Sequence, residues 1–229
     1  MIIGIFSDAH GNEQGFYKCH DLLRSQADTI IYLGDACGYF PLSNRIIDTL
    51  RTGNIECLKG NHDAMVLGEL EYNAEREDIY KIKNNRQQIS EENLEFLKGL
   101  QPAKEITVDG KKILLVHGSP ANPMNGYIYP DTDLSGFEDL PYDAVFMGHT
   151  HRALIKSLHN KLFVNVGSCG LPRDRGNAAT VCLYNTLTGD VSIKEIELDI
   201  TEILKRYEDH VHFSVRDVLK RNNKKFENE

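Results

Sequence analysis

The sequence lacks tryptophan and shows no CxxC pair among its five cysteines. An odd number of cysteines without such spacing argues against a disulfide framework and a structural zinc site, and is typical of reduced thiols in the cytosol. No stretch approaches the roughly 18 consecutive apolar residues that a membrane-spanning helix needs. Residues 1–6 also lack the basic start and the long apolar run of a secretory signal. These absences predict a cytoplasmic protein that does not span a membrane.

Positive charge is scarce as well. The 229 residues carry 26 Lys and Arg against 34 Asp and Glu, a formal net charge of −8. Proteins that bind nucleic acids or anionic membranes grip phosphate groups with clustered Lys and Arg. The acidic balance therefore argues against both partners, although a local basic groove is compatible with an acidic total. Nothing in the pattern indicates an oligomeric state.

Short apolar runs alternate with amphipathic segments at the start of the chain, which predicts parallel strands joined by helices. We expect strands at 1–6, 28–33 and 55–58, and helices at 13–25 and around 46–50. Residues 64–88 are mostly helical in character. Ser90, followed by Glu91 and Glu92, predicts the start of another helix.

The second half of the chain is richer in strands. We expect a hairpin at 106–116 around Asp109-Gly110, strands at 144–147, 153–155, 162–166, 180–184 and 191–196, and a helix from Thr201. No linker rich in Gly, Ser or Pro divides the chain, which predicts one domain over residues 1–229 with a polar tail that frays from about residue 217. The pattern indicates a layered α/β protein in which two packed sheets are flanked by helices.

Polar residues that can bind metal follow five of the apolar strands. The five blocks are Asp8-Ala9-His10, Gly34-Asp35, Gly60-Asn61-His62-Asp63, His117-Gly118 and Gly148-His149-Thr150-His151. Sites in open α/β sheets lie at the carboxyl ends of strands, so these blocks are expected to converge. Oxygen and nitrogen donors without thiolate suit Mn, Fe, Zn, Ni or Co better than Ca or Mg alone. About seven ligands are too many for one tetrahedral zinc and suit two ions that share a carboxylate.

The order of these blocks resembles the calcineurin-like metallophosphoesterases, in particular their small, uncapped, bacterial-type phosphodiesterases and phosphatases. The resemblance implies a two-sheet β-sandwich flanked by helices, with a binuclear metal site at one edge. It implies that one metal is held by Asp8, His10 and His151, the other by Asn61, His117 and His149, and both by Asp35. Mn is the first candidate metal, with Fe, Zn, Ni or Co as alternatives. His62 would stand over the substrate as general acid or stabilise charge in the transition state.

The chemistry agrees with that resemblance. Two metal ions about 3.5–4 Å apart can share a water, lower its pKa toward neutrality and direct the hydroxide in line at phosphorus. The metal charge would also attract an anionic ester into an acidic protein. We therefore expect a metal-dependent hydrolase of a small anionic phosphate ester, a monoester or a diester, with a nucleotide as one candidate. A non-enzymatic scaffold on the same fold, like the retromer scaffold subunit, is the alternative. Such scaffolds have lost metal ligands or the catalytic imidazole, whereas this sequence keeps both.

Several other residues have two interpretations. Arg173, or less readily Arg175, is expected to meet the substrate phosphate, and a surface salt bridge is the alternative. Asn12 and Asn61 are candidates for binding substrate, although Asn12 would serve equally well to stabilise a turn. Tyr127 and Tyr129 line a substrate pocket or pack their loop. The segment after Asp35 lacks the arginine of the Ser/Thr protein phosphatases, which argues against that activity.

Overall fold

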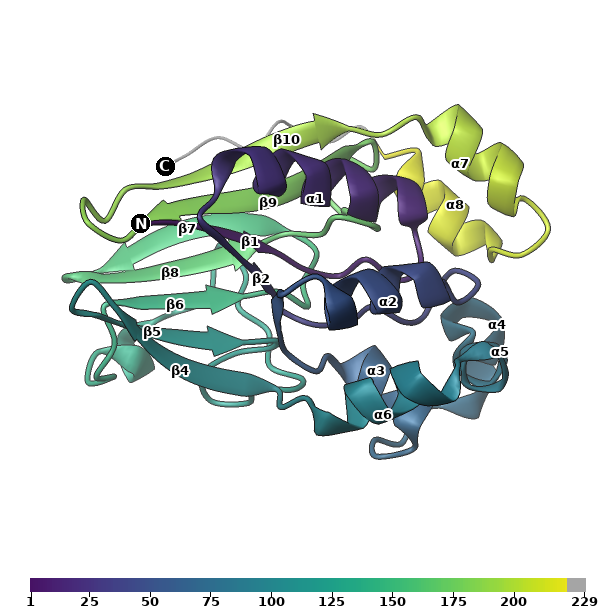
Figure 1. The fold of residues 1–229 in the computed structure, drawn as a ribbon, viewed down its shortest axis with the longest axis horizontal. Helices are drawn as coiled ribbons and strands as arrows, with labels where there is room; N and C mark the ends of the chain where they lie inside the picture. The colour runs from purple at the N-terminus through teal and green to yellow at the C-terminus, as the bar shows by residue number, and fades with distance from the viewer. Residues whose placement is uncertain (222–229) are drawn as a thin grey trace.

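A computed structural model describes residues 1–221 and contains two five-stranded sheets flanked by helices (Figure 1). The first sheet has the order β10-β9-β1-β2-β3 and consists of β1 (Ile2–Phe6), β2 (Thr29–Tyr32), β3 (Glu56–Cys57), β9 (Ala178–Asn185) and β10 (Val191–Glu197). β1, β2 and β3 are parallel, as the opening alternation of strands and helices predicts, and β9 and β10 add antiparallel strands beside β1. The third strand is shorter than expected.

The second sheet has the order β4-β5-β6-β8-β7 and consists of β4 (Ala103–Val108), β5 (Lys111–Val116), β6 (Ala144–Met147), β7 (Ala153–Leu158) and β8 (Lys161–Val166). β5, β6 and β8 run parallel, and β4 pairs with β5 as the predicted hairpin. Asp109 and Gly110 at its turn have φ of 50° and 78°. Two left-handed residues in a two-residue turn match the twist of a hairpin.

Helices cover the first sheet and gather at one end of the molecule. The helices are α1 (Glu13–Gln26), α2 (Asn44–Thr52), α3 (Asn61–Leu67), α4 (Glu77–Tyr80), α5 (Ile82–Gln88), α6 (Glu91–Gly99), α7 (Ile200–Tyr207) and α8 (Phe213–Leu219), with short 3-10 turns η1 (Ala74–Arg76) and η2 (Ser135–Phe137). α1 and α2 lie over the first sheet, and α3 to α8 cluster beyond the strands (Figure 1). Ser90 caps α6 as predicted, because its side chain accepts a hydrogen bond from the Asn93 amide.

Two stretches depart from the expected helices. The segment 64–88 is helical only in pieces, since α3 ends at Gly68 with a left-handed φ of 78° before η1 restarts the turns. The expectation of a frayed tail from about residue 217 is wrong as far as Leu219. There α8 continues, and Val215 and Leu219 are buried against the core beneath the helices. Residues 222–229 lie outside the described part of the chain.

One core cluster lies between the sheets, where Ile5 of β1 and Leu33, directly after β2, meet Leu115, Phe146 and Val164 of the second sheet. A second cluster fills the space between the first sheet and its helices. Burial on both faces explains why these strands are nearly continuous apolar runs. Such rigid strands hold the residues that follow them at fixed positions.

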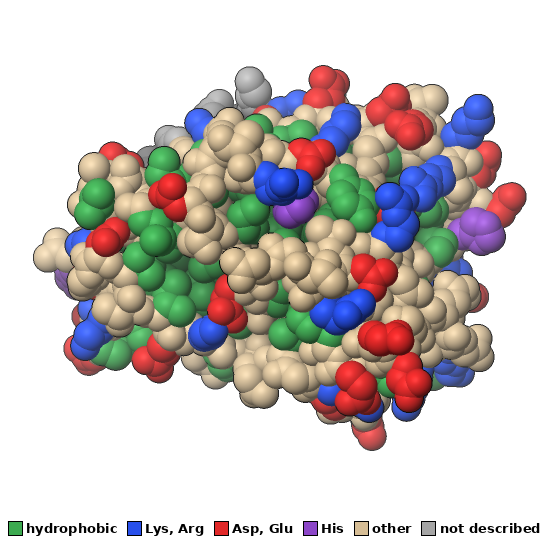
Figure 2. Space-filling model, in the orientation of Figure 1, with side chains coloured by type: hydrophobic (Ala, Val, Ile, Leu, Met, Phe, Trp, Pro, Cys, Tyr) green, Lys and Arg blue, Asp and Glu red, His purple; other side chains and the backbone are tan. Residues whose placement is uncertain are grey.

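The surface is mixed in charge. Acidic and basic side chains are interspersed on the face that α1 and α2 cover (Figure 2). Among residues 1–221, no helix is both long and apolar enough to cross a lipid bilayer.

Candidate metal centre

The seven predicted ligands come together at the carboxyl ends of the parallel strands. They are Asp8 and His10 after β1, Asp35 after β2, Asn61 at the start of α3, His117 after β5, and His149 and His151 after β6. All seven are buried. Two groups form, Asp8–His10–His151 and Asp35–His117–His149, and the ligand atoms within each group lie within 4.8 Å of one another. The convergence that the sequence predicts is therefore present.

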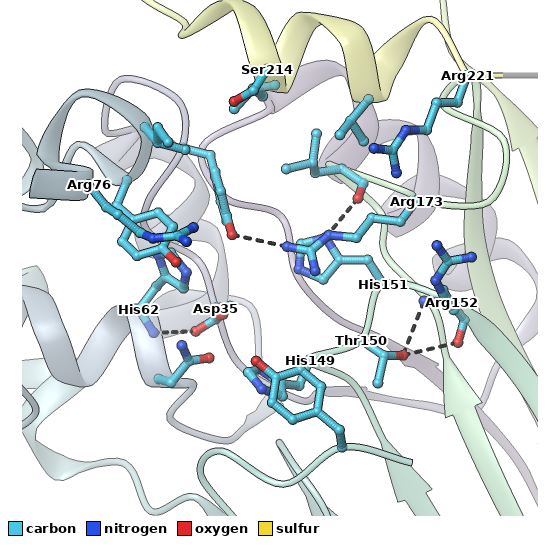
Figure 3. Close-up of a pocket in the computed structure, with 18 of the residues that line it drawn as sticks. Asp35, His62, Arg76, His149, Thr150, His151, Arg152, Arg173, Ser214 and Arg221 are labelled. Atoms are coloured by element: carbon cyan, nitrogen blue, oxygen red, sulfur yellow. Dashed lines mark hydrogen bonds between the residues drawn. The ribbon is translucent and has the colours of Figure 1, made fainter. Parts of the chain in front are cut away.

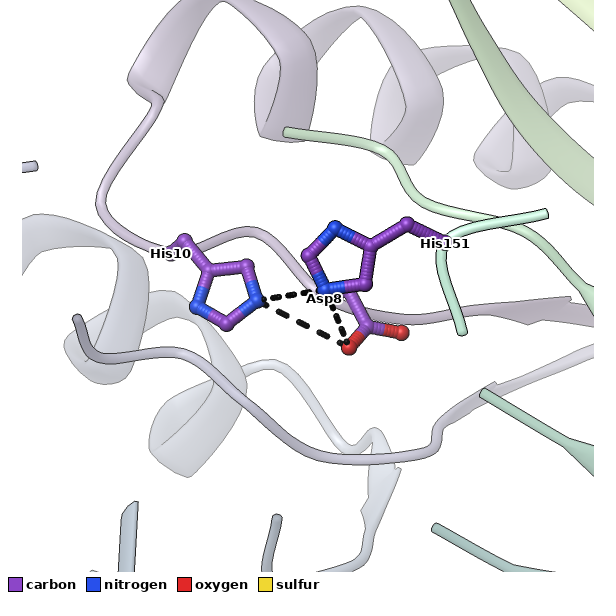
Figure 4. Close-up of side chains that lie close together, drawn as sticks. All are labelled: Asp8, His10 and His151. Carbon is purple, nitrogen blue, oxygen red and sulfur yellow. Dashed lines mark hydrogen bonds and ion pairs between the residues drawn. The ribbon is translucent and has the colours of Figure 1, made fainter. Parts of the chain in front are cut away.

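The first group consists of hydrogen-bond acceptors that face one another (Figure 4). His10 Nδ1 lies 2.7 Å from the Cys37 carbonyl, and His151 Nδ1 lies 2.7 Å from the Leu171 carbonyl. A neutral imidazole has one N–H, which these carbonyls require on Nδ1, so each Nε2 carries only a lone pair. The two Nε2 atoms are nevertheless 3.0 Å apart, and each lies within 3.7 Å of Asp8 Oδ1. Lone pairs and a carboxylate at this distance need a cation among them.

The second group repeats this arrangement. His117 Nδ1 lies 2.8 Å from the Leu33 carbonyl, which leaves Nε2 as an acceptor 3.0 Å from Asn61 Oδ1 and 3.4 Å from Asp35 Oδ2. Asp35 Oδ2 is also 3.7 Å from His10 Nε2 of the first group. The Asp35 carboxylate therefore lies between the two groups.

Unpartnered polar atoms mark the same place. Asp8 Oδ1 and His149 Nε2 are buried without a hydrogen-bond partner in the described chain. Leaving such an atom unsatisfied costs about 1–3 kcal/mol, and more for a charged group. Oxygen and imidazole donors without thiolate are the ligands of divalent transition metals. The residues present thus fit metal ions.

The charges of the site point the same way. Burial raises the pKa of the Asp8 and Asp35 carboxyls, but the surrounding histidines outweigh burial and hold both values below their usual range. Burial lowers the pKa of His117, yet Asp35 beside it dominates and raises that value to about 9. A positive charge at His117 Nε2, either a proton or a metal ion in its place, is therefore strongly favoured beside Asp35. In residues 1–221, the only ion pairs of Asp8 and Asp35 are with histidines. Two buried carboxylates without Lys or Arg partners create a demand for positive charge.

The backbone at the ligands is unusual. Asp8, His10, Asp35, His149 and His151 have φ between 50° and 66°. This left-handed conformation is rare for residues other than glycine and costs about 1 kcal/mol or more for each residue. Such strain persists only where the surrounding structure enforces it. The residue types at these five positions did not predict the left-handed conformation.

Asp63 enforces part of this geometry, and the sequence analysis assigned it no role. Its carboxylate accepts hydrogen bonds from the amides of Asp35, Ala36, Cys37 and Gly60, and so ties the turn after β2 to the start of α3. Burial, with the nearby Asp35 charge, raises the Asp63 pKa to about 6. The signal in the sequence was an acidic residue at the third position of a helix, where its side chain can accept a hydrogen bond from the backbone amide of the N-cap residue.

His62 lies beside the metal ligands. Its ring centroid is 4.9 Å from that of His10 and 4.7 Å from that of Tyr39, and its Nδ1 is buried without a partner among the described residues. Burial lowers the His62 pKa to about 3. One of its nitrogens lies within 4.8 Å of the ligand atoms of His10 and Asp35, so the imidazole is in contact with the space that the metals would share.

A cavity of about 770 Å³ opens above these metal ligands, which we call the metal floor (Figure 3). Its lining includes His62, Asn61, His149 and His151, the tyrosines Tyr39, Tyr80, Tyr127 and Tyr129, and the arginines Arg76, Arg152, Arg173 and Arg221. The predicted Arg173 therefore reaches the cavity, where its guanidinium donates to the Tyr39 hydroxyl at 3.0 Å. Arg76, Arg152 and Arg221 were missed, because isolated surface arginines carry no signal in a sequence.

The other predicted residues divide between the two interpretations. The Asn12 side chain caps α1 and donates to the Gly170 carbonyl, so its contacts support the structural role. Arg175 pairs with Glu195 at 2.6 Å and lies outside the large cavity. Tyr127 and Tyr129 line the cavity with their rings stacked 5.8 Å apart, and they are 51% and 37% exposed. Their position supports the pocket interpretation.

Comparison with known proteins gives a consistent result. A family model for a calcineurin-like phosphoesterase superfamily domain matches residues 1–189. An uncharacterized protein of Methanocaldococcus jannaschii is 31% identical over 226 residues, which is 90% of this chain and 91% of that protein. A hypothetical protein of Pyrococcus horikoshii superposes with a TM-score of 0.83 at 21% identity, over 98% of this chain and 99% of that one. A metallophosphoesterase from Sphaerobacter thermophilus superposes with a TM-score of 0.75 at 24% identity, over 96% and 98%. The structural likeness shows the shared fold, and the match of the family model shows that this chain belongs to the calcineurin-like phosphoesterase superfamily.

Proposed function

We propose that this protein is a metal-dependent hydrolase of small phosphate esters. The observation that carries the proposal is the set of buried acceptors that face one another at the floor of a cavity rimmed by arginines. Buried hydrogen-bond acceptors that lack donors need cations between them, and the arginines that line the cavity favour the binding of an anion. A phosphate ester in contact with two divalent metals satisfies both requirements.

The ligands divide into two sets in this proposal. Asp8, His10 and His151 would hold one ion, Asn61, His117 and His149 would hold the other, and the Asp35 carboxylate would be available to both. Bound divalent ions, with Mn as the first candidate and Fe, Zn, Ni or Co as alternatives, would supply a water that ionises near neutral pH and would neutralise phosphoryl charge. The backbone carbonyls behind His10, His117 and His151 keep each Nε2 free to bind.

Other residues act on the ester itself. Burial keeps the His62 ring neutral, so it can hydrogen bond through its N–H to the developing charge on the leaving oxygen. To act as general acid it must first take up a proton beside the bound anionic ester, which raises its pKa. Asn61 lies beside the scissile phosphate. Arg173 binds a phosphoryl oxygen through the N–H groups that Tyr39 leaves free.

The stacked Tyr127 and Tyr129 rings offer a flat surface for an aromatic group of the substrate, so a nucleotide is the candidate we favour. Tyr127 also lies 4.3 Å from the His149 ring, measured between centroids, which brings this surface next to the metal floor. We place the activity in the cytoplasm, because all five cysteines are free thiols. We treat residues 1–229 as one functional domain.

The test is a metal titration. The purified chain is stripped of metal, Mn²⁺ is added back, and hydrolysis of bis-p-nitrophenyl phosphate and of p-nitrophenyl phosphate is followed in parallel. We expect activity to rise until about two ions are bound per chain. The diester-to-monoester ratio then gives the preferred ester class. Bound metal without hydrolysis of either ester, or of nucleotides, would contradict the proposal, and failure to bind metal would favour the scaffold.

A further inference from the structure

Arginine is more abundant around the cavity than one phosphate requires. Arg152 pairs with Asp174 at 2.6 Å, but Arg76, Arg173 and Arg221 form no ion pair with any described carboxylate. Among residues 1–221, Asp35 is the only acidic residue in the cavity lining, and it belongs to the metal floor. Unpaired guanidinium groups that face a cavity are typical sites for phosphate oxygens.

Arg173 and Arg221 share one wall of this cavity. The Gly176 amide in the loop after Arg173 donates to the Arg221 carbonyl at 2.9 Å. A Cβ at Gly176 would lie 2.2 Å from the Leu219 carbonyl oxygen, so this loop packs directly on the end of α8. Both arginines lie on the α8 side in Figure 3, whereas Arg76 lies on the opposite side near His62. Both arginines line the cavity, and the contact at Gly176 fixes the segment that carries Arg221 against the loop that follows Arg173.

Arg173 adjoins the metal floor, and in Figure 3 it lies between Arg221 and Asp35. Its backbone amide donates to the carbonyl of His151, and one of its five N–H groups donates to Tyr39. The remaining donors can bind one anion on the side of the metals and another on the side of Arg221. We propose that Arg173 and Arg221 together bind a second phosphate group of the substrate, besides the phosphate that is hydrolysed; this rests on the proposed function.

The substrate class then becomes narrower. Among nucleotides, the second phosphate can be contiguous, as in a diphosphate, or can sit on another position of the sugar, and a nucleotide of either kind is within the size range of a cavity of about 770 Å³. Arg221 lies outside residues 1–189, where the family model matches. The C-terminal helix, with Val215 and Val218 also in the lining, therefore selects the substrate while the shared floor performs the hydrolysis.

The experiment compares three nucleotides that differ in their second phosphate. AMP, ADP and adenosine 3′,5′-bisphosphate are tested on the Mn²⁺-loaded full chain at fixed free Mn²⁺. Their affinities are measured as inhibition of bis-p-nitrophenyl phosphate hydrolysis and by calorimetric titration. The variants are Arg221→Gln and Arg221→Lys. Arg216→Gln, on α8 just before Arg221, serves as the control because Arg216 is not in the cavity lining.

We expect ADP or the 3′,5′-bisphosphate to bind at least about tenfold more tightly than AMP, and whichever does so identifies the position of the second phosphate. R221Q should remove this preference, R221K should keep part of it because the charge remains, and R216Q should keep all of it. Equal affinity for the three nucleotides in the unchanged protein, or a preference that survives in R221Q, overturns the inference. The calorimetric arm reads binding even where no ester is hydrolysed, so failure of the proposed function is seen separately.

Discussion

The floor of the cavity and its rim are built in different ways. The floor consists of residues that follow directly on buried strands. All seven predicted ligands are buried, and neighbouring backbone carbonyls or amides hold the side chains of Asp8, His10, Asp35, His117 and His151. The rim consists of arginines and tyrosines from short helices, loops and the end of α8, and Tyr127 and Tyr129 are substantially exposed. The floor is rigid, because its residues are buried at the ends of strands. The rim contacts the floor at only a few places. In the proposed function, the residues of the rim determine which ester is bound.

The largest effect should come from breaking the floor at Asp35, whose carboxylate lies between the two ligand groups. Asp35→Asn removes the negative charge that both ions would share, so we expect metal content to fall from two ions per chain toward none. Hydrolysis should fall by about 10³-fold or more, because metal ions supply several kcal/mol of transition-state stabilisation. Metal analysis by mass spectrometry and initial rates measure this.

The control for Asp35 is Asp48→Asn, a half-exposed carboxylate on α2 that pairs with Arg51. It should change neither metal content nor rate. Retention of two ions by the Asp35 variant would show that this carboxylate is not a shared ligand, even if the rate fell.

The next largest effect is expected at His62, where a loss of turnover should occur without a loss of bound metal. His62→Ala should keep both ions and slow turnover by about 10²–10⁴-fold, the range for loss of a general acid. The loss should be greater for an alkyl ester than for a nitrophenyl ester, because an alkoxide needs a proton to leave and a nitrophenolate does not. Equal losses on the two esters would exclude proton donation as its role, and loss of metal would make His62 a ligand.

The floor could be predicted from the sequence and most of the rim could not, for physical reasons. Asp8, Asp35 and His117 each follow an apolar run, and strand ends in such sheets meet at one edge, so local pattern implies proximity. Arg221 reaches the cavity only because α8 packs against the loop at Gly176, a contact between segments about 45 residues apart that no local pattern records. The left-handed backbone at His149 likewise depends on its surroundings and not on its residue type. Asn12 was ambiguous because capping and ligand binding favour the same residue type.

A smaller effect is expected from the rim at Arg173. Arg173→Gln should raise the KM for phosphate esters by about 10–100-fold, since hydrogen bonds to charged groups contribute about 1.5–3 kcal/mol, and should leave metal content unchanged. Arg152→Gln is the matched control. Its guanidinium is already neutralised by Asp174, so KM should change by less than about threefold. Similar effects in the two variants would mean that the rim acts only through its total charge.

The smallest effect should arise where floor and rim meet, at Tyr39. Its ring packs edge-on against His10 of the floor, and its hydroxyl accepts the hydrogen bond from Arg173 of the rim. Tyr39→Phe keeps the ring and removes only that hydrogen bond, so KM should rise about 2–10-fold while kcat and metal content stay constant. Tyr80→Phe is the control, because the Tyr80 ring also borders His62 but its hydroxyl has no hydrogen bond among residues 1–221. A fall in kcat without a change in KM would mean that Tyr39 acts with the floor, as a support for His62. Arg173 would then be the residue at which the rim begins.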